Sequence, residues 1–109
     1  MNEIKKTIDK LLKFRDEREW EQFHNSKDLA LALSIEASEL LELFLWKENE
    51  DFDKEKLEDE LADVLSYGLL LAHKHNLDIA DIINKKILKN SKKYPVTKAK
   101  GTSKKYNEL

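Results

Sequence analysis

Residues 29–43 read LALALSIEASELLEL and residues 57–71 read LEDELADVLSYGLLL, and these two stretches decide the fold. In each of them apolar residues recur every three or four positions, which is the period of an amphipathic helix. An acid stands within each apolar seam, Glu36 in the first and Glu60 in the second. The apolar members of the two seams are Leu29, Leu33, Leu40 and Leu43, and Leu57, Val64 and Leu71. Both helices therefore place a carboxylate where a core residue is expected.

A second acid follows each of these carboxylates by three residues, which is one helical turn: Glu39 after Glu36, and Asp63 after Glu60. We expect all four to point toward the interior. Buried carboxylates without partners would be too costly for a domain whose stability is only about 5–15 kcal/mol. The two arginines lie on an earlier predicted helix, so a divalent cation is the expected compensation. All-oxygen ligands favour Mg²⁺, with Mn²⁺ as a substitute, over zinc or di-iron.

The rest of the chain also predicts helices. It contains 2 Gly and 1 Pro, and 39% of its residues are charged, which suits an all-α protein. Four helices are expected: the first at about residues 2–23, the second at about 27–47, a third that reaches about residue 75, and a fourth that opens at 78–81 and ends before Pro95. Asn25 or Ser26 is expected to cap the second helix and Asp51 or Asp53 the third. We expect a single domain over residues 1–109, with a helical core at about 2–93 and an extended basic tail at 94–109. Oligomerisation would help a core of this size.

Several classes of protein are excluded or disfavoured. The chain has no cysteine, so disulfides, thiol nucleophiles and cysteine-ligated zinc are ruled out. Residues 1–13 are charged throughout and have no apolar stretch typical of a signal peptide. No apolar run reaches the length of a membrane span. We therefore expect a soluble, cytoplasmic protein that does not bind membranes.

Charge is unevenly distributed along the chain. Residues 1–84 contain 21 acidic and 11 basic residues, whereas residues 85–105 contain nine lysines and no acid. The basic end fits nucleic acid, the phosphates of a small ligand, or a solvated tail. Because it is short and the rest of the chain is acidic, nucleic acid is disfavoured. Lys86 and Asn90 are one turn apart and can contact phosphate oxygens together.

Aromatic residues gather near the predicted helix ends. Trp20 and His24 end the first helix, Trp46 ends the second, and Tyr67 follows Asp63 by one turn. Such residues fit either a core or interface, or a slot in which a nucleobase stacks.

The spacing Glu36-x-x-Glu39, twenty residues, Glu60-x-x-Asp63 resembles the signature of the MazG-like, all-α nucleotide pyrophosphohydrolases. Further stretches resemble the dCTP pyrophosphatase branch of that family. They are RDEREWEQFH (15–24), LLELFLWK (40–47), ELADVLSY (60–67), KYP (93–95) and GTSKKY (101–106).

The resemblance implies a Mg²⁺-dependent enzyme of nucleotide-pool sanitation. It would convert dCTP, or a related or modified nucleotide, to the monophosphate and pyrophosphate. Glu36, Glu39, Glu60 and Asp63 would carry the metal, and Glu39 and Glu36 would be catalytic, with Glu39 orienting or deprotonating the water. The base would contact His24, Trp20, Trp46 and Tyr67, and the phosphates Lys86 and Asn90.

The resemblance also implies that four-helix subunits pack into helical-bundle oligomers, as tetramers or dimers, with sites formed between subunits. Two alternatives stay open. One is a broad house-cleaning pyrophosphatase for non-canonical triphosphates. The other is a catalytically silent helical module that binds nucleotides or a partner protein.

Overall fold

The computed structural model describes residues 2–48 and 50–109, and it confirms the all-α fold. Within these ranges there is no β-strand. The elements are α1 (Glu3–Glu17), η1 (Glu21–Phe23), α2 (Ser26–Glu42), α3 (Lys54–Lys74), α4 (Ile79–Lys93), α5 (Val96–Ala99) and η2 (Tyr106–Glu108). The chain divides into two compact units, Met1–Asn76 and Leu77–Leu109, and each is described by itself.

Each of the four long helices begins behind a side chain that caps it. A capping oxygen accepts hydrogen bonds from backbone N–H groups that the first turn leaves without partners. Of the predicted alternatives, Asn25 caps α2 and Asp53 caps α3. The caps of α1 and α4 are Asn2 and Asp78.

The first helix is shorter than the sequence predicted, since α1 ends at Glu17 and not near Phe23. The carbonyl of Arg15 accepts from the backbone N–H of Trp20 at 3.1 Å, and Glu19 adopts a left-handed φ of 53°. This backbone reversal starts the short helix η1. Trp20 and His24 consequently lie in a turn that leads into α2.

The second helix also ends early, at Glu42 and not near Lys47. Residues 43–46 form turns, and Trp46 has a φ of 62°, a conformation that is unusual for a bulky residue. The rings of Phe44 and Phe52 lie 5.4 Å apart and join the two sides of the connection to α3.

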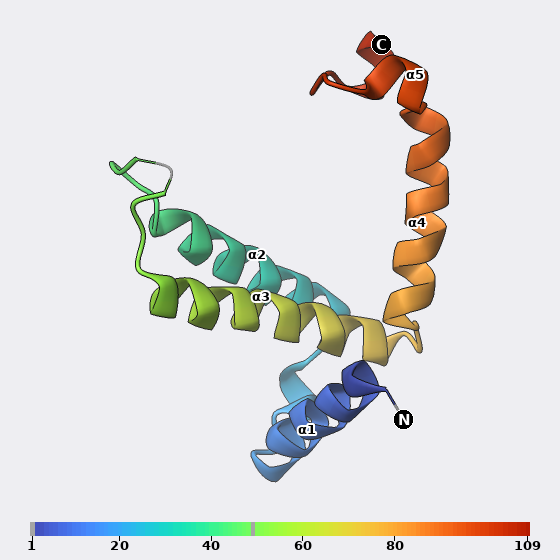
Figure 1. The fold of residues 1–109 in the computed structure, drawn as a ribbon. Helices are drawn as coiled ribbons and strands as arrows, with labels where there is room; N and C mark the ends of the chain where they lie inside the picture. Colours follow the sequence, from blue (N-terminus) through green and yellow to red (C-terminus); the bar gives the residue numbers. More distant parts are fainter. Residues whose placement is uncertain (1, 49) are drawn as a thin grey trace. The chain divides into compact units, whose positions relative to one another are not determined.

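Helices α2 and α3 lie side by side and antiparallel, and α1 packs against α3 (Figure 1). The buried residues of this first unit, among those described, are Leu29, Leu70 and Ala72. At one end of the hairpin, Ser26 Oγ and His75 Nε2 are hydrogen-bonded at 2.8 Å. The hairpin therefore has a narrow core, and a side-chain hydrogen bond joins the start of α2 to the end of α3.

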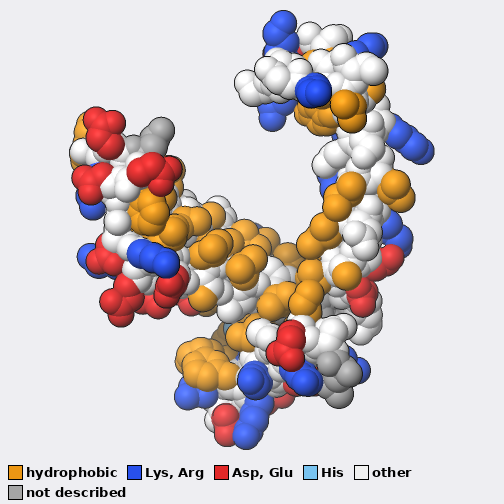
Figure 2. Space-filling view, in the orientation of Figure 1, with side chains coloured by type: hydrophobic (Ala, Val, Ile, Leu, Met, Phe, Trp, Pro, Cys, Tyr) orange, Lys and Arg blue, Asp and Glu red, His pale blue; other side chains and the backbone are white. Residues whose placement is uncertain are grey.

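Large apolar side chains of this unit remain exposed. On α2, Leu31, Ile35 and Leu45 near its end are each at least half exposed, and on α3 Leu61 and Leu65 are 42% and 58% exposed. Figure 2 shows hydrophobic side chains gathered along the visible face of the α2–α3 hairpin. A helix that is apolar on several sides normally contacts protein on several sides.

The second unit consists of α4 and the segment that follows it. The sequence predicted an extended tail after residue 93, but that segment contains α5 and η2. The carbonyl of Pro95 accepts from the N–H groups of Lys98 and Ala99, which closes α5 as a single turn. The rings of Tyr94 and Tyr106 meet edge to face at 6.3 Å and hold the two ends of the segment together. None of the helices in the described ranges combines the length and apolarity needed to cross a membrane.

Candidate active site

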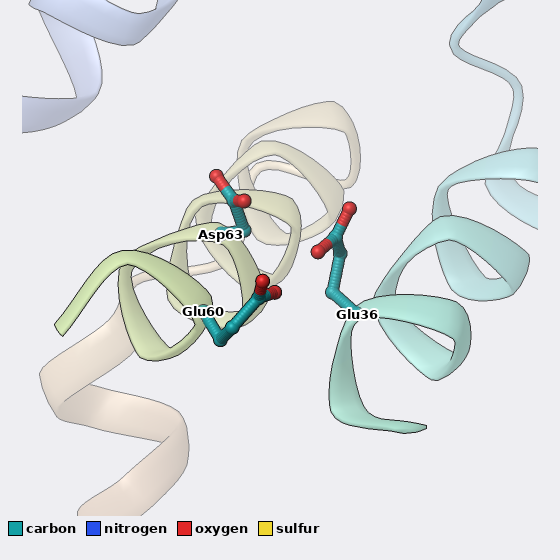
Figure 3. Close-up of side chains that lie close together, drawn as sticks. All are labelled: Glu36, Glu60 and Asp63. Carbon is teal, nitrogen blue, oxygen red and sulfur yellow. The ribbon is translucent and has the colours of Figure 1, made fainter. Parts of the chain in front are cut away.

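Three carboxylates converge in the α2–α3 hairpin. Glu36 of α2, together with Glu60 and Asp63 of α3, each offer an oxygen within 4.8 Å of the others (Figure 3). The helices bring them together because Glu36 lies on the side of α2 that faces α3, and Asp63 follows Glu60 by one turn. The predicted convergence of acids from two helices is thus present for these three.

Glu39 lies beside this group but is not one of the three. It is half-buried, as are Glu36 and Glu60, whereas Asp63 is exposed. The expectation that all four point into the interior was therefore wrong for Asp63. Asp63 follows Glu60 by one turn of α3, and its side chain is exposed where it lines an open cavity.

The surroundings of Glu36 and Glu60 raise the pKa of both carboxyl groups. A hydrogen bond with Glu39, which requires a proton on one of the two groups, is the largest cause that raises the pKa of Glu36 to about 7. Burial and the negative charges of Glu39 and Asp63 act in the same direction. Burial, followed by a hydrogen bond with Glu39, raises the pKa of Glu60. The cluster thus holds negative charge at a cost that a bound cation would remove.

The donor set fits a hard divalent cation. Oε2 of Glu36 and Oε2 of Glu60 are buried without a hydrogen-bond partner. No lysine or arginine within residues 2–48 and 50–109 forms an ion pair with any of the four carboxylates. Oxygen-only ligands with uncompensated charge are what Mg²⁺ and Mn²⁺ prefer. Glu36, Glu60 and Asp63, with Glu39 adjacent, can hold such an ion.

An open cavity of about 350 Å³ lies beside the cluster and shares Asp63 with it. Of the predicted base-contacting residues, Trp20, His24 and Tyr67 line this cavity. The other lining residues are Leu11, Phe14, Arg15, Ser66 and Leu70. The rings of Phe14 and Trp20 meet edge to face at 5.7 Å, which gives the cavity an aromatic wall. A planar, aromatic ligand with an anionic group fits a space of this kind next to a cation site.

The surroundings shift the pKa of two titratable residues of the cavity toward the neutral form. Burial, followed by the charge of Arg15, lowers the pKa of His24, although Glu21 acts in the opposite direction. Burial, followed by the charges of Glu36, Asp63 and Glu39, raises the pKa of Tyr67. The Tyr67 hydroxyl therefore keeps its proton next to the carboxylates and remains a hydrogen-bond donor.

The remaining three predicted site residues are Trp46 in the first unit and Lys86 and Asn90 in the second. Trp46 is 99% exposed and does not line the cavity, because α2 ends before it and its backbone turns away in a left-handed conformation. Lys86 and Asn90 are exposed and one turn apart on α4, in the second unit. Their contact with phosphates stays a prediction.

The sequence interpretation missed the contributions of α1 to the cavity. Leu11 and Phe14 are three residues apart, a spacing that by itself predicts only the apolar face of a helix. Arg15, next to Phe14, begins the stretch that resembles the dCTP pyrophosphatase branch, but no role in the site was predicted for it. Ser66 follows Asp63 by three residues, and that spacing alone could have placed it beside the site.

Comparison with known proteins agrees with this geometry. The family model described as the MazG-like family matches residues 31–109, which include all four carboxylates. The chain belongs to the MazG-like family. Membership accounts for the paired acids on α2 and α3 and for the all-helical fold.

Relatives within the family share most of this chain. The dCTP pyrophosphatases 1 of Bos taurus and Homo sapiens are each 38% identical to it over 104 residues, which cover 88% of this chain. The chain spans less than two thirds of their length, 62% and 61% respectively. The crystal structure of a pyrophosphatase from Archaeoglobus fulgidus superposes with a TM-score of 0.82 at 36% identity, over 87% of this chain and 94% of that one.

Proposed function

We propose that this MazG-like protein hydrolyses a nucleoside triphosphate to the monophosphate and pyrophosphate, with dCTP or a related or modified deoxynucleotide as substrate. The observation that carries the proposal is the cluster of three carboxylates beside a cavity with an aromatic wall. The three are those of Glu36, Glu60 and Asp63. The similarity to dCTP pyrophosphatases and to an archaeal pyrophosphatase supports the reaction type.

Mg²⁺ is the proposed cofactor, and Mn²⁺ is a substitute. When bound, a divalent cation neutralises phosphate charge and lowers the pKa of water. Glu36, Glu39, Glu60 and Asp63 are the proposed ligands. Glu39 is also proposed to orient or deprotonate the water that attacks the α-phosphorus, with Glu36 assisting. Pyrophosphate then departs with the oxygen that bridged the α- and β-phosphorus atoms.

The cavity is the proposed base site. Trp20 supplies a stacking surface and Tyr67 a hydroxyl donor next to the carboxylates, while His24 is a neutral polar contact. A base in this cavity would have its triphosphate directed toward Asp63, which belongs to both the cavity and the cation site.

The protein is further proposed to act as a homo-oligomer, a tetramer or a dimer. The exposed apolar residues of α2 and α3, such as Ile35 and Leu65, form a surface that a second copy would cover. Trp46 is proposed to reach a base site only within such an assembly, and Lys86 and Asn90 to bind phosphates. A cytoplasmic location belongs to the same proposal, because the substrate would be a nucleotide of the cellular pool. No nucleic acid is a proposed partner.

A panel of nucleoside triphosphates with Mg²⁺ tests the function. Released pyrophosphate and orthophosphate are quantified separately for the wild type and for Glu60→Gln, with Glu58→Gln as the matched control because Glu58 is exposed on the same helix. Pyrophosphate from dCTP that disappears only in Glu60→Gln is expected. Comparable turnover of many non-canonical triphosphates would favour the broad house-cleaning enzyme. Absence of turnover would favour the silent binding module.

A further inference from the structure

Arg15 is the only lysine or arginine among the described residues that line the cavity. Its side chain is 13% exposed although it lies at the end of a surface helix. It also lines a second cavity of about 250 Å³, together with His24, so the two side chains lie between the two spaces. The N–H donors of a guanidinium that is largely buried beside a cavity keep one orientation. A fixed orientation of donors is required for the recognition of a ligand.

Two acids fix that direction. Asp16 accepts from Nε of Arg15 at 2.8 Å and lies 2.8 Å from Nη2, and Glu21 lies 3.6 Å from Nη2. Within the described part of the chain no hydrogen bond or ion pair engages Nη1. Arg15 therefore retains donors that its own neighbours do not use, and a guanidinium can only donate.

The surrounding charge indicates which ligand atoms these donors suit. Asp16 and Glu21 both pair with Arg15, so their negative charges compensate its positive charge. A compensated guanidinium attracts a triphosphate weakly, whereas its unused donors suit a neutral acceptor such as a ring nitrogen or carbonyl oxygen. The aromatic residues beside Arg15, Phe14 and Trp20, are also surfaces for a base and not for phosphate.

We propose that Arg15 selects the base by donating to the acceptor atoms on its pairing edge, N3 and O2 in cytosine. In uracil and thymine N3 carries a hydrogen, so a donor would face a donor and the base would be rejected. The inference rests on the proposed function for its substrate, but it concerns the recognition of the base and not the hydrolysis.

Steady-state hydrolysis of dCTP and dUTP by Arg15→Met, Arg15→Lys and the wild type tests the inference. The ratio of kcat/KM for dCTP over dUTP is expected to fall by about tenfold or more in Arg15→Met. Arg15→Lys keeps the positive charge but loses the planar set of guanidinium N–H donors. The kcat/KM ratio is therefore expected to fall in this variant as well. Arg18→Met is the matched control, because Arg18 is exposed, stacks on the Phe14 ring at 3.7 Å and does not line either cavity. Its ratio is expected to change by less than about twofold.

An equal loss for dCTP and dUTP in Arg15→Met, with the ratio unchanged, would show a phosphate contact or a purely structural role and would overturn the inference. Calorimetric titration of dCMP and dUMP gives a readout independent of turnover. If no triphosphate is hydrolysed, the proposed function fails. Preferential binding of dCMP that is lost in Arg15→Lys would then still support the inference, and equal binding of both monophosphates would overturn it. Circular dichroism of each variant establishes that the helices are retained.

Discussion

Glu36 of α2 and Glu60 of α3 approach each other across the hairpin, and each has one buried carboxylate oxygen without a hydrogen-bond partner. Two helices that pack through their apolar residues thus bring like charges together at the same level. In the absence of a cation this pair opposes the packing that creates it. The behaviour of the metal-free protein is therefore as informative as its activity.

Mg²⁺ is expected to raise the melting temperature of the wild type, and chelation is expected to lower it, because the ion compensates the carboxylates only in the folded chain. In Glu60→Gln one negative charge is removed, so the metal-free variant is expected to melt above the metal-free wild type and to respond weakly to Mg²⁺. Thermal denaturation followed by circular dichroism at pH 8 checks both effects. A metal-free Glu60→Gln that melts below the wild type would show that the carboxylates do not destabilise the hairpin.

The stability of the metal-free protein should fall as pH rises. The pKa of Glu36 is about 7 in the folded chain against an ordinary value of 4.5, so between these values the folded state binds more protons than the unfolded state. The contribution of Glu36 to folding stability is fully present below about pH 4.5 and is lost as pH rises through about 7. Denaturant titrations of the wild type and Glu36→Gln across this pH range measure the free energy of unfolding. It should change less with pH in the variant than in the wild type. Equal slopes in the two proteins would contradict the raised pKa.

Mg²⁺ binding should weaken as pH falls through about 7, because the proton on Glu36 competes with the ion. Calorimetric titrations at pH 6 and pH 8 measure the change, and proton release on binding should appear as a dependence of the heat on the buffer. Glu36→Asp, which keeps a carboxylate, is the companion variant. An affinity that does not change with pH would exclude Glu36 from the ligands.

The hydrogen bond between Ser26 and His75 should stabilise the hairpin by about 1 kcal/mol. Ser26→Ala is expected to lower the free energy of unfolding by that amount. Ser38→Ala is the control, since the Ser38 hydroxyl donates only to the carbonyl of Ser34 on its own helix. Urea denaturation of both variants measures the free energy of unfolding. Equal losses in the two variants would mean that the hydrogen bond between Ser26 and His75 does not stabilise the hairpin.

The apolar side of α2 should be an interface between copies. Leu31→Asp places a charge where a second chain is expected, five residues away from Glu36, and should reduce the mass measured by sedimentation equilibrium. Gln22→Asp adds the same charge at an exposed polar position and should leave the mass unchanged. A wild type that sediments as a single chain would remove the proposed oligomer.

Local pattern predicted the helices and narrowed each of two starts to a pair of candidate caps, of which the structure selects Asn25 and Asp53. Helix ends were predicted less well, since the reversals at Glu19 and Trp46 depend on left-handed backbone that the helical period does not reveal. Glu36 and Glu60 stood out as polar residues within apolar seams. Arg15 did not, because its place in the cavity arises from the turn after α1 and from contacts with Glu21.

One wall of the cavity comes from a different part of the chain than the carboxylates, although α3 contributes to both. Trp20, His24 and Arg15 belong to α1 and to the turn that follows it, whereas the acids belong to the α2–α3 hairpin. Under the proposed function, substitutions before residue 26 would therefore alter which base is accepted while leaving the proposed cation ligands untouched. Base preference and Mg²⁺ affinity would then be separable properties of this protein.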